Sequence, residues 1–142
     1  MSEIIKLKSG SKFEDLISYS RVIVAGDMIF VANTAGRNYT TREIAPDARG
    51  QAEQAFRNIE SALAAVGASL KDVVAIRSHV PNPDDVQAVG AFLGEKFRGI
   101  DPAGTMICTP LAHDEMKCEF EVTAYRRRFP DMPETRLRIQ LA

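Results

Sequence analysis

The chain has 142 residues, of which 45% are hydrophobic and 26% charged, a size and composition that predict one compact domain with a real core. The formal net charge of −1 excludes a global field that would attract nucleic acid or an anionic membrane. Because no apolar run approaches a membrane span and the N-terminus lacks a signal-peptide pattern, we expect a cytoplasmic protein with neither nucleic-acid nor membrane partners.

A β-hairpin is the first predicted unit, with arms at residues 21–24 and 28–32 joined by Gly26-Asp27. The second arm is apolar at both parities, so we expect both of its faces to be covered. We assign Ile29 and Val31 to the face that the helices leave open.

Two helices and three further strands follow. Pro46-Asp47 opens a long pattern with apolar residues every three or four positions, which Gly67 ends as a left-handed cap. A second amphipathic run ends near Phe97. The remaining strands are expected at about 72–80, 105–109 and 117–126, and the last two are expected to form a closing hairpin.

The resulting order, ββαβαββ, predicts an α+β fold in which one mixed sheet carries two helices on one face. A soluble monomer would not normally leave the other apolar face in water, so we expect a symmetric homo-oligomer.

Glu119 lies in the last predicted strand. Alternation places Cys118 and Phe120 on one face and Glu119 and Glu121 on the other. This second face is either solvated or covered by the oligomer, and in the covered case the pKa of Glu119 would rise and suit it to acid-base chemistry.

The spacing of cysteines and histidines favours neither a redox motif nor a metal site, and we expect no cofactor. Cys108 and Cys118 are interpreted as small buried hydrophobic residues. His79 and His113 have no metal-ligand spacing to a common cluster. The run Arg126 to Arg128 is interpreted as a solvated strand end rather than a nucleic-acid patch.

Several segments in a shared order resemble the RidA family, also called YjgF/YER057c/UK114. They are Tyr19, Gly26-Asp27-Met28-Ile29, the helix Gln51 to Gly67 with Asn58, Pro102-Ala103, and Glu119-Phe120-Glu121. The resemblance covers about residues 18–126 of a single domain and leaves 127–142 as a C-terminal extension. It implies a chorismate-mutase-like fold, a homotrimer, and small-molecule clefts between adjacent subunits.

In its best-understood branch the family hydrolyses enamines and imines to 2-oxo acids and ammonia. The resemblance implies that Glu119 orients the attacking water. The family's turn of the form Pro-Ala-Arg supplies an arginine for the substrate carboxylate, and Gly104 stands in that position here. Gly104 therefore permits a turn, widens the pocket, or does both.

Other residues are candidates for substrate binding. Tyr19, Asn33 and Thr105 would shape the cleft, and the amides around Gly104, Thr105 and Met106 would accept an anion. Arg77 and Arg37 either replace the missing arginine or are ordinary surface residues.

Two functions remain open. One is a RidA-like hydrolase or deaminase acting on a reactive imine, enamine or small carbonyl metabolite other than 2-iminobutanoate and 2-iminopropanoate. The other is a non-catalytic, small-molecule-binding or regulatory trimer. The apolar alternation of Leu137, Ile139 and Leu141 reads as a short edge strand, in either a disordered tail or a segment laid over a neighbouring subunit.

Overall fold

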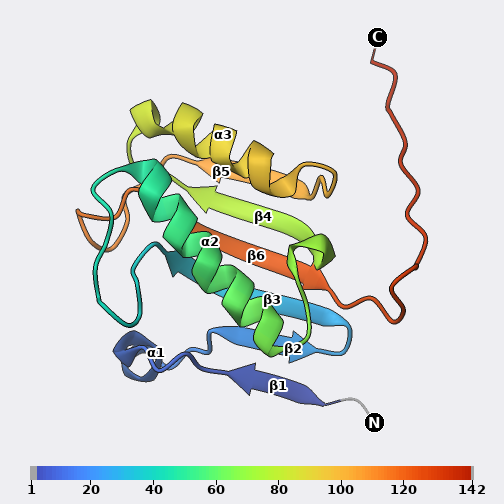
Figure 1. Ribbon diagram of the computed structural model, residues 1–142, viewed down its shortest axis with the longest axis horizontal. Coiled ribbons are helices and arrows are strands. Elements are labelled where there is room, and N and C mark those ends of the chain that lie inside the picture. Colours follow the sequence, from blue (N-terminus) through green and yellow to red (C-terminus); the bar gives the residue numbers. More distant parts are fainter. Residues whose placement is uncertain (1–2, 142) are drawn as a thin grey trace.

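The computed structural model describes residues 3–141 and contains one six-stranded mixed sheet (Figure 1). The strands are β1 (Ile4–Leu7), β2 (Val22–Ala25), β3 (Met28–Ala35), β4 (Val73–His79), β5 (Ala103–Ile107) and β6 (Glu119–Tyr125). Their spatial order is β1-β2-β3-β6-β4-β5. Only β4 and β5 run parallel, and the other neighbouring pairs are antiparallel.

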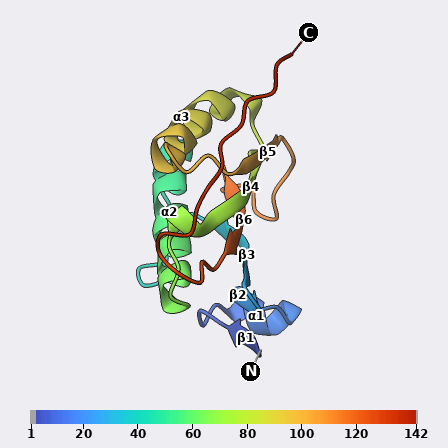
Figure 2. The same cartoon turned by 90° about the vertical axis from the view of Figure 1, so that its right-hand side faces the viewer.

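The helices are α1 (Lys12–Ile17), α2 (Ala48–Ala65) and α3 (Val86–Phe97), with short 3-10 turns at Leu70–Asp72 and Pro83–Asp85. Helices α2 and α3 lie on the same face of the sheet, which confirms the predicted layer arrangement (Figure 2). Phe56 of α2 lies at the centre of this layer. Its ring packs edge-to-face on Phe92 and Phe97 of α3 and on Phe120 of β6, at centroid distances of 5.2, 5.6 and 5.1 Å.

Helix α2 begins and ends where the sequence predicts. The Asp47 carboxylate accepts a hydrogen bond from the Gly50 amide at 3.2 Å, which satisfies one free donor of the first turn. Gly67 has φ of +76°, and the Ala68 amide donates to the Leu63 carbonyl at 2.9 Å. This left-handed glycine cap turns the chain toward β4.

Two N-terminal elements were not predicted. Strand β1 has four residues and α1 has six, so neither is long enough to show a convincing hydrophobic period. A usable signal was present, because Ser11 and Glu14 have the Ser-x-x-Glu spacing typical of a helix start. In the structure the Glu14 carboxylate instead accepts a hydrogen bond from the backbone amide of Ser9, at 2.7 Å.

The prediction for the two faces of β3 was wrong. Ile29 and Val31 are buried on the helix side of the sheet, whereas Phe30 points to the open face and is 45% exposed. Both parities of this strand are apolar, so the sequence could not tell which one meets the helices. An apolar open face exists, but Phe30 supplies it.

The expected closing hairpin of the last two strands was also wrong. Strand β5 pairs with β4 at the sheet edge, and β4 separates it from β6. Gly104 lies inside β5 opposite Ile76 rather than in a turn, and the left-handed residue before the strand is Asp101, with φ of 54°. A crossing of this kind is non-local and leaves no mark on either strand's own sequence.

The C-terminal segment leaves β6 and forms no strand within the described residues (Figure 1). Leu137, Ile139 and Leu141 are exposed and form no edge strand within one copy, and their placement over a neighbouring subunit stays a prediction. Arg136 ties the segment to the end of α3, donating to the Asp101 carboxylate at 2.5 Å and to the Gly99 carbonyl at 2.7 Å.

The expectation for the cysteines was half right. Cys118 is buried, and burial raises the pKa of its thiol to about 12, so it acts as a core residue. Cys108 is exposed at the end of β5. In residues 3–141 no helix combines the length and apolar character needed to cross a bilayer.

Candidate functional site

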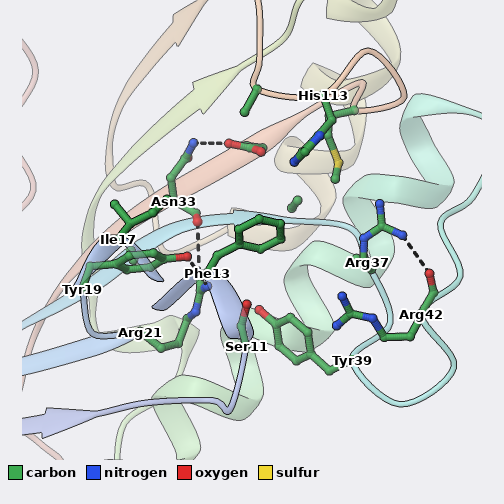
Figure 3. A pocket seen from close by; sticks show the side chains of 15 residues that line it. Ser11, Phe13, Ile17, Tyr19, Arg21, Asn33, Arg37, Tyr39, Arg42 and His113 are labelled. Carbon is green, nitrogen blue, oxygen red and sulfur yellow. Dashed lines mark hydrogen bonds between the residues drawn. The ribbon is translucent and has the colours of Figure 1, made fainter. Parts of the chain in front are cut away.

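A cavity of about 390 Å³ lies at one end of β3 and β6, closed by α1 and by two loops, residues 37–42 and 112–116 (Figure 3). Its walls include four residues singled out in the sequence, namely Tyr19, Asn33, Arg37 and Glu119. Glu119 lies 86 residues after Asn33 in the chain, and the β3–β6 pairing of the sheet brings the two together.

A β-bulge in β3 positions Asn33. Val31 pairs with Val122 and Thr34 with Phe120, so three steps along β3 match two along β6. The extra residue shifts the alternation: Val31 and Thr34 are both buried, and Asn33 is left lining the cavity. Without the bulge the alternation would run on from Val31 and bury Asn33.

Arg21 stabilises this bulge through hydrogen bonds from its guanidinium. Its guanidinium donates to the Asn33 carbonyl at 3.0 Å, to the Thr34 hydroxyl at 3.2 Å and to the Tyr19 hydroxyl at 3.2 Å. It also donates to the Glu14 carboxylate at 3.1 Å, and Glu14 is fully buried. Each of the three guanidinium nitrogens of Arg21 therefore has a structural partner, and its charge is balanced inside the protein by Glu14.

Glu119 and Asn33 form the polar wall of the cavity. The Asn33 side-chain amide donates to Glu119 Oε2 at 2.5 Å, which fixes the carboxylate and leaves Oε1 for another contact. Burial raises the pKa of Glu119, against the opposing influence of the positive charges of His79, His113 and Arg21. A carboxylate of this kind is suited to exchange protons with a bound molecule.

His79 is a neighbour of Glu119 that the sequence analysis did not connect with it. The two residues are directly opposite in the β4–β6 register, so their side chains share the open face. The sequence offered no local signal for this pairing, because the two positions lie 40 residues apart and the register belongs to the assembled sheet.

Two buried amide side chains of α2 hold the loops around the cavity. Asn58 donates to the carbonyls of Ala35 and Arg37, at 3.2 and 2.9 Å. Gln51 donates to the carbonyl of Glu115 at 2.9 Å and accepts from the amide of Lys117 at 2.7 Å. Helix α2 therefore positions both loops, which explains physically why an amide side chain suits these helix positions.

Aromatic and basic residues complete the cavity. The rings of Phe13 and His113 lie 5.9 Å apart at a tilt of 52°, and the Phe13 ring lies near the middle of the lining residues (Figure 3). Arg37, Tyr39 and Arg42 line the side away from Asn33 (Figure 3). Burial raises the pKa of the Tyr39 hydroxyl, which keeps it a neutral hydrogen-bond donor.

The remaining sequence candidates lie elsewhere in the chain. Gly104, Thr105 and Met106 belong to β5 and do not line this cavity. Arg77 is exposed on β4 and pairs with Glu121 at 3.7 Å. Within a single copy, therefore, the β5 residues do not meet Glu119.

Sequence reasoning missed Phe13, Tyr39, Arg42 and His113 as wall residues. Phe13 was missed because α1 was not predicted, and the other three lie in irregular loops whose path no periodicity reports. Among residues 3–141, no group of three or more histidine, cysteine, aspartate or glutamate side chains is placed to hold a metal ion.

Comparisons with known proteins agree with this architecture. A family model described as Endoribonuclease L-PSP matches residues 10–126. A crystal structure of a YjgF/YER057c/UK114 family member from Mycobacterium tuberculosis superposes with a TM-score of 0.79 and 32% identity, covering 87% of this chain and 99% of that one.

Two curated relatives are more distant. A 2-iminobutanoate/2-iminopropanoate deaminase from Dermatophagoides farinae is 29% identical over 90 residues, which are 63% of this chain and 70% of the relative. A RutC family protein from Pyrococcus abyssi is 29% identical over 109 residues, or 76% of this chain and 86% of the relative.

Proposed function

Because the chain belongs to the RidA (YjgF/YER057c/UK114) family, whose family model is described as Endoribonuclease L-PSP, we propose that it hydrolyses a reactive imine, enamine or related carbonyl compound in the cavity beside Glu119. The observation that carries the proposal is the Asn33–Glu119 pair, which holds a partly buried carboxylate of raised pKa against a cavity of small-molecule size.

The chemistry asks little of the protein, because an iminium carbon is already electrophilic. Glu119 Oε1 accepts a proton from a bound water as the water oxygen bonds to the imine carbon and the C=N π electrons move to nitrogen, and Glu119 then passes this proton to the nitrogen. In the resulting carbinolamine the hydroxyl proton moves to the nitrogen as the C–N bond breaks, so that imine and water give carbonyl and ammonia. A positioned acid-base group of this type contributes about 100-fold or more to the rate.

Gly104 narrows the substrate class. It offers no guanidinium for a carboxylate attached to the reacting carbon, and nothing but the Ile76 side chain, at 4.0 Å, lies near where its Cβ would be. We therefore propose that 2-iminobutanoate and 2-iminopropanoate, the substrates in the name of the mite relative, are not the preferred substrates here.

We also propose that the working cleft lies between subunits of a homotrimer. Residues Gly104, Thr105 and Met106 are on the edge strand, away from the Glu119 of their own copy, so they would shape the cavity of a neighbour. Tyr19, Asn33 and Glu119 would come from the first copy.

The experiment follows ammonia release from imines generated in situ by amine and amino-acid oxidases, relative to spontaneous hydrolysis. We expect Glu119→Gln to lower the rate about 100-fold while ligands still raise the melting temperature. Glu121→Gln is the matched control, since Glu121 lies two residues along the same strand face but outside the Glu119 cavity. Equal rates for wild type and Glu119→Gln would contradict the proposal.

A second arm tests the role of Gly104. With 2-iminobutanoate and 2-iminopropanoate, the wild type should be weak and Gly104→Arg should be faster. Strong wild-type activity on these two imines would overturn the emphasis on the missing arginine.

The alternative is a non-catalytic trimer that binds a metabolite in the same cavity. The observation favouring it is Gly104, because losing the substrate-holding arginine is compatible with loss of turnover. It predicts ligand-induced stabilisation without ammonia release from any imine in the panel.

A further inference from the structure

A second, smaller cavity of about 180 Å³ adjoins the first. It is lined by Lys12, Phe13, Arg37, Arg42, His113 and Met116, and we call it the cationic pocket. Five of these six residues also line the Glu119 cavity, so the two spaces share a wall. Three arginine or lysine side chains and one histidine border the cationic pocket, and no carboxylate does.

Among the arginine and lysine side chains of this pocket, only Arg37 is paired with a carboxylate of the described residues. Arg37 is already paired with the Glu115 carboxylate. The guanidinium of Arg42, by contrast, makes no hydrogen bond or ion pair with any residue of the described chain, and neither does the ammonium of Lys12, which lies 5.3 Å from the centroid of the Phe13 ring. The positive charges of Arg42 and Lys12 are thus paired with no acidic side chain of residues 3–141, and unpaired positive charge beside a cavity is typical of an anion site.

The loop that carries Arg42 is held in a fixed backbone conformation. Arg42 has φ of 69°, an unfavourable value for a residue with a side chain, and its amide donates to the Asn38 carbonyl at 2.9 Å. Arg37 Nη1 donates to the Arg42 carbonyl at 2.8 Å. The Asn38 side chain accepts from the amides of Thr40 and Thr41, at 2.9 and 3.0 Å. The left-handed backbone at Arg42 is therefore maintained by the loop around it.

The two ends of one bound ligand would meet different groups, Glu119 at one end and the cationic pocket at the other. Asn33, which holds Glu119, lies on one side of the main cavity, Arg37 and Arg42 lie on the other, and the Phe13 ring lies between them (Figure 3). A ligand that reaches both sides must therefore span an apolar stretch between its reacting carbon and its anionic group.

We propose that the cationic pocket, through Arg42 with Lys12, binds a carboxylate that is separated from the reacting carbonyl or imine carbon by an apolar chain rather than attached to that carbon. This inference rests on the proposed function, since it places the reacting carbon at Glu119. It assigns the carboxylate to a different part of the ligand from a 2-imino acid, which fits the glycine at position 104.

Two isomeric ligands test the inference without turnover. In 4-oxopentanoate the carboxylate is two methylene groups from the ketone, and in 2-oxopentanoate it is attached to the ketone carbon. By titration calorimetry, we expect the wild type to bind 4-oxopentanoate about fivefold more tightly, a modest factor because Arg42 is exposed. Arg42→Gln should reduce this preference, and the double variant Lys12→Gln/Arg42→Gln should abolish it.

Arg98→Gln is the matched control, because Arg98 is an exposed arginine that lines neither cavity, and it should keep the wild-type preference. No preference for 4-oxopentanoate in the wild type, including no binding of it at millimolar concentration, would overturn the inference. So would a double variant that binds as the wild type does, or inorganic phosphate competing as well as the carboxylate.

The outcome is separable from that of the hydrolase proposal. Glu119→Gln should retain the isomer preference, because Arg42 acts on the other side of the cavity. If Glu119→Gln retains both the isomer preference and turnover, the hydrolase proposal fails and the carboxylate site stands. If Glu119→Gln loses turnover but the wild type binds the two isomers equally, the hydrolase proposal stands and the carboxylate site fails.

Discussion

In Glu119 the proposed chemistry and the stability of the fold make opposite demands on one side chain. The cavity wall removes water from its carboxylate and raises its pKa, while the charges of His79, His113 and Arg21 offset only part of that effect. A residue with this balance costs folding free energy whenever it is ionised. Such a cost is expected where a group is retained for its chemistry.

The pH dependence of stability provides a test. The folded-state pKa of Glu119 is raised, so between the unfolded pKa, about 4.3, and the folded pKa the native state holds more protons and stability falls as pH rises. At neutral pH we expect Glu119→Gln to melt a few degrees higher than the wild type, about 1–4 °C after allowing for partial exposure. Below about pH 4 the difference should vanish.

Thermal melts from pH 3 to about pH 8 measure this, with Glu121→Gln as the control. Glu121 is partly exposed and faces Arg77 at 3.7 Å, so its variant should track the wild type to within about a degree at each pH. A gain for Glu119→Gln that is the same at every pH would show a packing effect instead.

At the residue scale the sequence could nominate side chains but could not arrange them. Tyr19, Asn33 and Glu119 were reached by resemblance, and their meeting depends on the bulge between Val31 and Thr34. Arg42 gave no sequence signal, because its position depends on a left-handed backbone in an irregular loop. A bulge and a loop path are set by contacts with distant residues, here Arg21 and Asn58.

At the scale of elements the sequence was more informative, because the long apolar period and both termini of α2 are local properties. Strands β2, β3, β4 and β6 were found within a few residues for the same reason. Which parity of β3 meets the helices, which strand pairs with β5 and whether Leu137 to Leu141 forms a strand depend on pairings between distant segments, and within one copy the structure differs from these expectations. Non-local contacts decided each of them.

Gly36 directly follows β3 and packs closely against the backbone of α2 beside the site. A Cβ at this position would lie 2.1 Å from the Gln51 carbonyl oxygen, and the nearby atoms are backbone atoms of α2 that cannot move aside. We expect Gly36→Ala to destabilise the protein by about 3 kcal/mol or more, measured by urea unfolding, because β3 must separate from α2. The loop that begins at Arg37 should move with it and weaken ligand binding.

Gly94 is the matched control. It lies on the exposed side of α3 with nothing within 4 Å of its would-be Cβ, so Gly94→Ala should add about 0.5–1 kcal/mol by favouring the helix. If both substitutions changed the free energy of unfolding by the same amount, the close approach of Gly36 to α2 would not be the cause of the destabilisation.

At the scale of the whole molecule, one copy leaves features that a second copy would explain. Phe30 on β3 and Ile107 on β5 are each 45% exposed, and a hollow of about 320 Å³ surrounds Phe30 between β2, β3 and β6. Helices α2 and α3 cover only the other face (Figure 2). The proposed trimer would bury this surface and bring the β5 residues Gly104 to Met106 toward a neighbour's Glu119.

Charge placed on the open face tests the assembly. We expect Phe30→Glu to shift the protein from a trimer to smaller species in analytical ultracentrifugation, because three buried carboxylates would lie close together without partners. Its far-ultraviolet circular dichroism should remain that of a folded chain, since Phe30 lies outside the core formed with α2 and α3. Ala91→Glu adds the same charge to the exposed side of α3, on the covered face, and should leave the sedimentation unchanged. A wild type that sediments as a monomer, or a Phe30→Glu variant that sediments as the wild type does, would contradict an assembly through this face, and the Glu119 cavity would then have to work within one copy.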